Sequence, residues 1–428
     1  MINLANTWQK KRIGDVFEIK QGKSLSSRKQ TGLNQKSFLR TSNVFWGRLD
    51  FSKLDEMDFS EDDCKTLALL PGDLLVCEGG DIGRTAIWQG EIEDCYYQNH
   101  LHRIRRMTSN ISPYFAMFWL QAGFTQLGTY DGAGNKTTIP NLSRSRLSVL
   151  EMPLPPLLEQ EKIAAILLKL QNAILIQDKI IKSLQELKKS TMDFVFTHGL
   201  HGEKTKMTPI GEIPQSWEVS ILGQEADIEY GVQAAVANAK DPTIGMPILT
   251  NINITSDGKI NLLTLRYYDV PNNKQDKLLL KKGDVLFNWR SGSQAHVGKT
   301  AYFNLEGDYT YSSFILRFRT KGRILDKFLY YYLTLARQRK FFLQNKNVSS
   351  INNVYNASMS ATIPVYYPDS MEYQNNIIDT IDSVNSKLQV NESHKSALED
   401  LFRTTLNKLM TGEIRVDDLD IDVKDVRV

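Results

Sequence analysis

Apolar residues recur at alternating steps of four and three in two stretches of this chain, one after PLPP (153–156) and one after IPVYYP (363–368). This spacing places an apolar stripe along a helix and is typical of a coiled-coil seam. A polar amide occupies the same slot in both stripes, where it favours one register because its hydrogen bonds are best satisfied by its partner. The seam residues are Ile163, Leu167, Leu170, Ile174, Gln177, Ile181 and Leu184, then Ile377, Ile381, Val384, Leu388, Asn391, Leu398 and Phe402.

The two stretches predict long helices that begin after the prolines, because proline and the residue before it disfavour earlier helix. We expect the helices to pair antiparallel as a coiled coil. The alternative is two amphipathic helices that each pack only on their own domain.

A second pattern, typical of a β-hairpin, also occurs twice. LPGDLLVCEGGDIGRTAIWQG (70–90) and KKGDVLFNWRSGSQAHVGKTAYF (281–303) both contain a Gly-Asp turn, a short apolar strand, a polar glycine-rich loop and Gly-[Arg/Lys]-Thr-Ala. Further matches keep the same order along the chain, including Trp8 and Gly22 against Trp217 and Gly231. Such self-similarity predicts a tandem duplication.

The predicted fold class is α+β, with two tandem, mostly-β domains that are each followed by a long helix. Internal helices are expected at Pro113–Phe124 and Leu325–Phe342. Antiparallel pairing of the long helices would give the molecule a pseudo-two-fold axis, like the local dyad of duplex DNA. The predicted segments are domain 1 (1–152), helix 1 (153–200), domain 2 (201–365), helix 2 (366–416) and a tail (417–428).

Composition adds limits rather than a function. The chain has 428 residues, 41% of them hydrophobic, with a net charge of +3 and three cysteines without metal-ligand spacing. We expect an ordinary cytoplasmic globular protein with reduced thiols. Basic residues cluster in HRIRR (102–106), RFRTKGR (317–323) and RQRK (337–340), which suits phosphate contacts or a solvated surface equally well.

The motifs of a catalytic protein are missing from the sequence. It contains no Asn/Asp-Pro-Pro-aromatic tetrapeptide, as a base-amino methyltransferase needs, and no Walker lysine motif. The six histidines lack the spacing of a metal site. We therefore expect neither catalysis nor a bound metal.

With these features, the chain resembles the specificity (S) subunits of type I restriction-modification systems. The resemblance rests on the repeated hairpin, the helix start PLPPLLEQEKIAAIL (153–167) and the closing LMTGEIRV (409–416). The second copy departs at the helix start, where only Gln374 keeps its place.

The resemblance implies two target-recognition domains that each read one half of an asymmetric, bipartite site in double-stranded DNA. It also implies that the helices dock two methyltransferase subunits and that motor-nuclease subunits complete the enzyme. S-adenosylmethionine, ATP and magnesium would then belong to the partner subunits only.

Polar side chains in the predicted loops are the candidate DNA contacts, because such groups read base edges. Arg84 and Lys299 are assigned alternatively to phosphates, since their motif recurs in both copies. The candidates in the first copy are Lys20, Lys23, Ser24, Arg28, Arg40, Thr41, Asn43, Glu78, Asp81, Arg84, Gln98, Asn99 and Lys136. Those in the second are Gln233, Asn251, Asn253, Asn288, Arg290, Ser291, Ser293, His296, Lys299, Tyr311, Ser312, Asn347, Ser349 and Asn352.

Two other functions remain open at this stage. A two-headed carbohydrate- or protein-binding module on a helical spacer would share the same repeat. A stand-alone nuclease would have to cleave DNA with magnesium as the purified chain.

Overall fold

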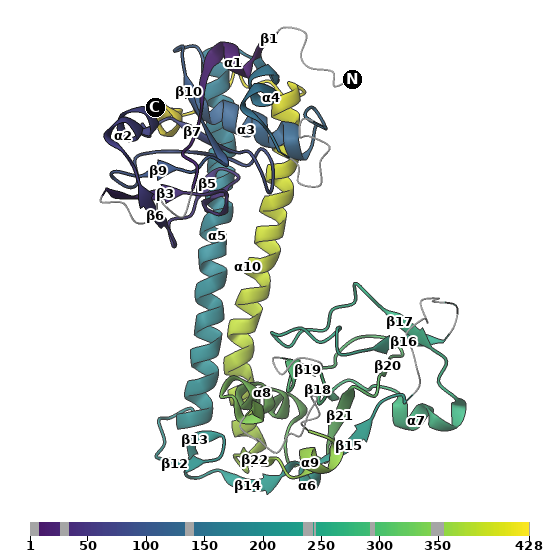
Figure 1. The fold of residues 1–428 in the computed structure, drawn as a ribbon. Coiled ribbons are helices and arrows are strands. Elements are labelled where there is room, and N and C mark those ends of the chain that lie inside the picture. The colour runs from purple at the N-terminus through teal and green to yellow at the C-terminus, as the bar shows by residue number, and fades with distance from the viewer. Residues whose placement is uncertain are drawn as a thin grey trace. The chain divides into compact units, whose positions relative to one another are not determined.

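A computed structural model describes residues 8–25, 34–132, 141–233, 243, 245–291, 296–343 and 355–427. They form two compact units (Figure 1). The first unit comprises the chain up to residue 179 together with residues 393–428, and the second comprises residues 180–392. Among the described residues, no helix combines the length and the apolar character that crossing a membrane requires.

The first copy of the repeat contains the following elements: β1 (Gln9–Arg12), α1 (Ile13–Val16), β2 (Phe17–Gln21), β3 (Gln35–Leu39), η2 (Thr41–Asn43), β4 (Val44–Phe45), β5 (Arg48–Leu49), β6 (Asp55–Asp58), α2 (Glu61–Leu67), β7 (Leu74–Cys77), β8 (Thr85–Ile87), β9 (Tyr96–Tyr97), β10 (Leu101–Arg106), α3 (Pro113–Thr125), α4 (Arg144–Val149), β11 (Glu151–Leu154) and the long helix α5 (Leu157–His198).

The second copy contains β12 (Thr205–Thr208), β13 (Gly211–Pro214), β14 (Glu218–Ile221), α6 (Leu222–Glu225), β15 (Ala226–Tyr230), β16 (Met246–Leu249), β17 (Arg266–Tyr268), η3 (Asn272–Lys274), α7 (Gln275–Leu278), β18 (Val285–Asn288), β19 (Thr300–Tyr302), β20 (Thr310–Tyr311), β21 (Ile315–Thr320), α8 (Asp326–Gln338), η5 (Phe341–Leu343), α9 (Ala357–Ala361), β22 (Pro364–Tyr367), the long helix α10 (Met371–Thr411) and η6 (Lys424–Val426).

The main sheet of each unit has four antiparallel strands, in the order β2-β10-β7-β8 in the first unit and β15-β21-β18-β19 in the second. The registers correspond, since Cys77 lies opposite Leu101 as Asn288 lies opposite Ile315. Each unit adds a three-stranded sheet, β6-β3-β9 or β17-β16-β20, and a two-stranded one, β1-β11 or β14-β22. The predicted duplication and both predicted hairpins are therefore confirmed.

The central strand β7 is buried on both faces, which explains its unbroken apolar sequence. Leu74 and Val76 pack into the core that contains α3, and Leu75 and Cys77 pack against the core of the three-stranded sheet. The same alternation holds for β18 between α8 and its own small sheet. The predicted internal helices are confirmed, although α8 ends at Gln338 and a short 3₁₀ turn follows it.

The repeated Gly-Asp turn is a structural motif. Gly72 adopts φ +92°, a region that disfavours residues with a Cβ. The Asp73 carboxylate accepts the Leu70 N–H at 2.7 Å and pairs with both Nε and Nη2 of Arg105, at 2.7 and 2.6 Å. Asp284 does the same for Lys281 and Arg319 in the second unit. Both aspartates are only 1% exposed, so the turn anchors the sheet internally.

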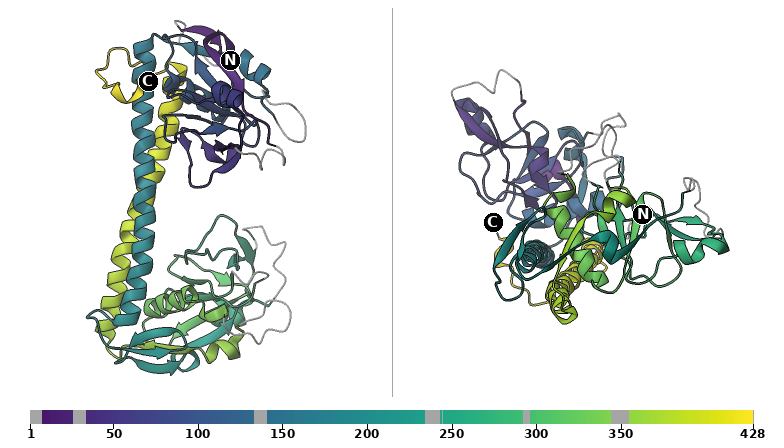
Figure 2. Two further views of the ribbon diagram at one scale, coloured as in Figure 1. Left: turned by 60° about the vertical axis from the view of Figure 1, so that its left-hand side comes forward. Right: turned by 90° about the horizontal axis from the view of Figure 1, so that it is seen from below.

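The two long helices pair antiparallel within each unit, as predicted. Figure 2 shows α5 and α10 running side by side. In the first unit, Lys395 of α10 pairs with Asp178 of α5 at 2.7 Å. All the predicted seam residues are buried or half-buried. Asn391 donates to the Lys387 carbonyl of its own helix at 2.7 Å, and the role of the seam amides in fixing register stays a prediction.

The ends of both helices also belong to the domain cores. Ile163 and Leu167 of α5 and Leu406 and Leu409 of α10 lie in the core of the first unit. Phe402 packs its ring 6.1 Å from that of Phe118 in α3. The helices therefore both pair and pack on domains, so the two alternatives drawn from the sequence describe different parts of the same helices.

A buried glutamine fixes the start of each long helix. Gln160 accepts the Ser112 N–H at 2.9 Å and donates to the carbonyls of Asn110 and Pro155 at 3.1 and 2.8 Å. Gln374 makes the equivalent three bonds, to Leu325, Arg323 and Pro368. Both glutamines are completely buried. These shared hydrogen bonds explain why Gln374 keeps the place of Gln160 although the rest of the helix-start motif differs in the second copy.

The segment after α10 closes the first unit. Arg415 pairs with the buried Glu159 near the start of α5 at 2.6 and 3.0 Å, and Lys162 donates to the Asp417 carbonyl at 2.6 Å. Val423 and Val426 are buried in the core of the first unit. The end of the chain is thus part of the domain that its beginning forms.

Candidate nucleic-acid interface

The loops of each unit gather at one edge of its main sheet. In the first unit β2 and β7 end at this edge while β10 and β8 begin there, because the strands are antiparallel. We call this side the loop edge, defined by residues 22–25, 78–84, 98–100 and 141–142 in the first unit and by 231–233, 289–291, 296–299 and 312–314 in the second. Most of the candidate DNA contacts that the structure describes lie on these segments.

The structure sorts the candidates by exposure. Ser24, Arg40, Asp81, Gln233, Arg290 and His296 are exposed, and Lys20, Lys23, Thr41, Arg84, Asn99 and Asn251 are half-buried. Those that are buried are Asn43, Glu78, Gln98, Asn253, Asn288, Ser291, Lys299, Tyr311 and Ser312. Arg28, Lys136, Ser293, Asn347, Ser349 and Asn352 lie outside the described residues.

Two of the buried candidates are equivalent asparagines that hold a turn. Asn43 accepts the Arg40 N–H at 2.9 Å and donates to the carbonyls of Asp50 and Lys53, both at 2.9 Å. Asn253 bonds Thr250 and two later carbonyls in the same way. Their amides are therefore already satisfied within the fold, and contact of either residue with DNA stays a prediction.

Arg84 and Lys299 also act within the fold. An Nη of Arg84 donates to the Thr41 carbonyl at 3.1 Å, and the Lys299 amine donates to the Ile254 carbonyl at 3.0 Å. Burial lowers the pKa of Lys299, and the nearby Arg337 lowers it further. The basic residue of the repeated Gly-[Arg/Lys]-Thr-Ala motif thus ties the hairpin to the turn beyond the adjacent small sheet. The assignment of Arg84 and Lys299 to bases or to phosphates stays a prediction.

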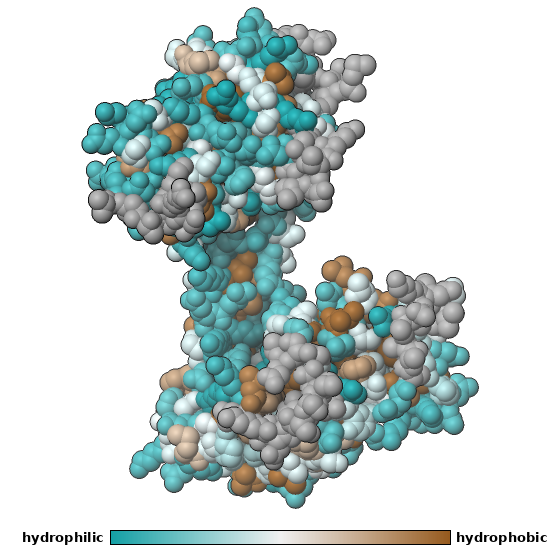
Figure 3. Space-filling view, in the orientation of Figure 1, coloured by the Kyte–Doolittle hydropathy of each residue, from teal (hydrophilic) through white to brown (hydrophobic). Residues whose placement is uncertain are grey.

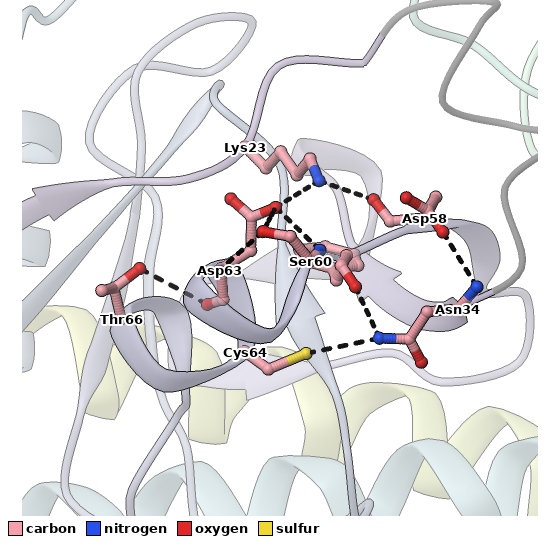
Figure 4. Close-up of polar contacts among 8 residues, drawn as sticks. Lys23, Asn34, Asp58, Ser60, Asp63, Cys64 and Thr66 are labelled. Atoms are coloured by element: carbon pink, nitrogen blue, oxygen red, sulfur yellow. Dashed lines mark hydrogen bonds and ion pairs between the residues drawn. The ribbon is translucent and has the colours of Figure 1, made fainter.

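Lys23 is held in a network beside α2, which Figure 4 shows. Its amine donates to the Asp58 carbonyl at 2.7 Å and pairs with the Asp63 carboxylate, which also caps the helix through Ser60. It lies 5.0 Å from the centre of the Phe59 ring. With a side chain only 10% exposed, Lys23 orders the strand-to-loop transition after β2.

The arginines of the basic sequence clusters are also engaged internally. Arg103 pairs with Glu18 at 2.8 Å, and Arg317 donates to the Lys277 carbonyl at 3.2 Å. Arg339 bonds Asp193 and the carbonyls of Ile210 and Glu212. These three arginines therefore stabilise the units through internal bonds. The choice between phosphate contacts and a solvated surface, which the sequence left open for the clusters, stays a prediction.

Different chemistry supports the two loop edges. In the first unit, Gln21 donates to the buried Glu78 carboxylate at 2.9 Å, and Asn141 donates to its other oxygen at 3.0 Å. His102 lies beneath them, and burial lowers its pKa. By strand register, the positions of Gln21 and Glu78 are occupied in the second unit by an aromatic pair.

That aromatic pair is Tyr230 and Trp289, whose ring centres lie 5.5 Å apart. The Trp289 indole donates to the Ser313 carbonyl at 2.8 Å, and the Tyr230 hydroxyl accepts the Ala357 N–H at 2.9 Å. The scaffold is thus common to both copies, whereas the residues on and under the loop edge differ.

The exposed side chains differ accordingly. Asp81, 80% exposed, lies on the first edge within 3.4 Å of Arg84. On the second edge Arg290 lies over the ring of Phe314, 5.6 Å from its centre. Sequence reasoning missed Phe314 because an aromatic residue next to a strand is usually core. The aspartates of the Gly-Asp turns and the glutamines at the helix starts were also missed as structural supports, although their recurrence in both copies was a usable signal.

The visible surface of both units is mainly hydrophilic. In the view of Figure 3 apolar residues occur in small groups among polar ones. A polar, hydrated surface suits a nucleic acid, whose interfaces are more polar than those between proteins.

Together, the described residues form duplicated α+β domains with differing polar loop edges and a pair of antiparallel helices. The fold is shared with the crystal structure of a type I restriction-modification S subunit from M. genitalium, with a TM-score of 0.59, 16% identity, and coverage of 96% of this chain and 97% of that one. A chain from a structural study of complex assembly in the type I R-M system matches with a TM-score of 0.56, 18% identity, and coverage of 96% and 99%.

The chain belongs to the family of the type I restriction modification DNA specificity domain, whose model matches residues 5–186 and 214–400. It is 24% identical over 426 residues to the putative type I restriction enzyme MjaX specificity subunit of Methanocaldococcus jannaschii, covering 96% of this chain and 94% of that one. The MjaVIII specificity subunit of the same organism is 27% identical over 289 residues, 66% of each chain. The protein is a DNA-specificity subunit and has no catalytic role of its own.

Proposed function

We propose that the protein recognises a bipartite, asymmetric sequence in double-stranded DNA, one half with each loop edge, in the cytoplasm. The observation that carries this proposal is the contrast between identical scaffolds and different edges. The internal ion pairs Asp73–Arg105 and Asp284–Arg319 are equivalent in the two units. At the loop edges, by contrast, Gln21 and Glu78 of the first unit are replaced in the second by Tyr230 and Trp289. Identical edges would read identical half-sites, whereas differing edges read an asymmetric site.

The antiparallel helices would set the separation of the half-sites. Each helix spans about 60 Å, from 42 residues in α5 and 41 in α10 at a rise of about 1.5 Å per residue. Because the seam is continuous in each helix, a change in helix length should change the length of DNA between the two half-sites and leave both loop edges intact.

We further propose that the outer faces of the helices recruit two methyltransferase subunits, which motor-nuclease subunits then join. Apolar side chains are exposed at equivalent places in both helices, Ile176 with Val390 and Leu187 with Leu401, each about half exposed. Single exposed apolar residues are common on protein surfaces, but their recurrence at equivalent places in both helices fits two copies of one partner. The double variant Leu187→Asp with Leu401→Asp should stop the chain from co-purifying with its methyltransferase.

The direct test of the function is a map of methylated adenines in host DNA with the gene present and absent. We expect one bipartite motif that depends on the gene. Replacing residues 8–150 with the corresponding segment of another family member should change one half of the motif alone. A change in both halves, or a motif without two parts, would contradict the proposal.

A further inference from the structure

The second loop edge carries an arginine arranged as the reader of a single base pair. Arg290 is exposed and is the second residue after β18. In the described part of the chain, no carboxylate lies within ion-pair distance of its guanidinium. The other arginines near this sheet are engaged, as Arg317 and Arg319 illustrate with a carbonyl and a carboxylate. The donors of Arg290 are therefore left for a ligand.

Phe314 holds that guanidinium in place. The guanidinium carbon lies 5.6 Å from the centre of the phenyl ring, within the range of a cation–π contact. Phe314 is 43% exposed although it is large and apolar, so its position on the edge is not explained by core packing. A planar cation stacked on a ring keeps its in-plane N–H donors available.

The backbone beneath the pair is fixed from both sides. Trp289 precedes Arg290 and donates to the carbonyl of Ser313, the residue before Phe314, at 2.8 Å. Trp289 also packs on Tyr230 with a ring separation of 5.5 Å. One indole thus ties together the two loops that carry the arginine and the phenylalanine, which gives the preorganisation that a specific contact needs.

From this arrangement we infer that Arg290 reads a guanine in the half-site of the second unit, with Phe314 as its positioning residue. The inference rests on the proposed function and names the base pair involved. A guanidinium matches the O6 and N7 acceptors of guanine through two parallel hydrogen bonds, which no other base offers in the major groove. The first unit has Gly79 at the position equivalent to Arg290, so the assignment applies to one half-site only.

The test is the selection of binding sites from randomised DNA duplexes by the full chain in complex with its methyltransferase subunits. Wild-type protein should select a G·C pair at one position of the second half-site. In the Arg290→Ala variant that preference should fall by roughly 5- to 150-fold, because the paired bonds are lost. Arg290→Lys should lose less, because an ammonium group can still donate to O6 and N7 but lacks the planar fork of the guanidinium. The first half-site should stay unchanged and serves as the internal control for folding.

Phe314 variants separate positioning from mere packing. Phe314→Ala and Phe314→Leu should each lower the G·C preference by about 2- to 5-fold, since both lack the aromatic face, whereas Phe314→Tyr should retain it. Arg48→Ala is the matched control. Arg48 is also exposed and lies 4.7 Å from the centre of a phenyl ring, that of Phe45, but it belongs to the first unit.

Several outcomes would overturn the assignment. A second half-site without a G·C pair would do so. An Arg290→Ala variant that keeps the full preference would also do so, because it would show that Arg290 does not read the base. A Phe314→Leu variant that behaves like wild type would refute the positioning role of Phe314. Selection of a site that is not bipartite would instead refute the proposed function, and the two failures are therefore distinguishable.

Discussion

Replacing the buried glutamine at the start of either long helix should destabilise the unit to which it belongs by a predictable amount. Gln160→Ala removes three hydrogen bonds, of 2.8–3.1 Å, to backbone groups that water does not reach. At about 1 kcal/mol for each bond, the loss is about 3 kcal/mol. Gln374→Ala should cost the same in the second unit, since it also removes three bonds, of 2.8–3.0 Å.

The isosteric Gln160→Glu variant should be less stable than Gln160→Ala at neutral pH. A carboxylate keeps the bond from the Ser112 N–H, but it faces two carbonyls to which it cannot donate. Burial and those carbonyls raise the pKa of the new carboxyl in the folded state. The folded chain then holds a proton that the unfolded chain releases, so the deficit should shrink as the pH falls from about 7 toward about 5.

Urea unfolding of the full chain, followed by hydrogen exchange in α3 and α8, would measure these losses separately for the two units. Each single variant should lower protection in its own unit only, and the double alanine variant should lower both additively. The reasoning would be wrong if Gln160→Ala lost less than about 1 kcal/mol, or if the alanine and glutamate variants had equal stability at every pH.

Three further perturbations have defined outcomes. Gly231→Ala would place a Cβ 2.2 Å from the Tyr311 carbonyl oxygen, so site selection should lose the second half-site. The control Gly79→Ala would place a Cβ with no atom within 4 Å and should cause no steric clash. Equal effects of the two variants on site selection would contradict this reasoning. Burial lowers the pKa of His102 below the ordinary histidine value of 6.5. As the pH falls through 6.5, the unfolded chain therefore takes up a proton more readily than the folded chain, and the stability of the first unit should fall with acidification. His102→Leu, which copies the residue at the equivalent place in the second unit, should flatten that pH profile in hydrogen exchange. Deleting seven residues from both α5 and α10 in phase should shorten the DNA between the two half-sites in the methylation map. Altered half-site bases would refute the proposal that the helices set this separation.

The duplication, the hairpins and the long helices could be predicted because local chemistry encodes them. Heptad spacing, prolines before the helices and glycines at turns act within a few residues of one another. The division into units could not be predicted from such signals. It depends on the return of α10 and the tail to the first domain, through contacts such as Arg415 with Glu159.

Residue type alone could not separate exposed candidates in the site from those that bond internally, for an equally physical reason. An amide or an ammonium group can satisfy its bonding with a base or with a carbonyl of its own chain, and residue type does not distinguish the two. Asn43, Asn253 and Lys299 turned out to bond internally. Exposed residues such as Arg290 can be separated from them only when burial and neighbours are known.

The return of the last helix to the first domain affects how the protein is made. A ribosome releases residues 180–392 as one uninterrupted run, so the second unit can assemble while synthesis continues. The first unit has to wait for residues 393–428, which supply part of its core. A nascent chain therefore exposes an incomplete apolar core in its first domain until residues 393–428 have been synthesised, and a truncation that removes them would destabilise the domain that was synthesised first.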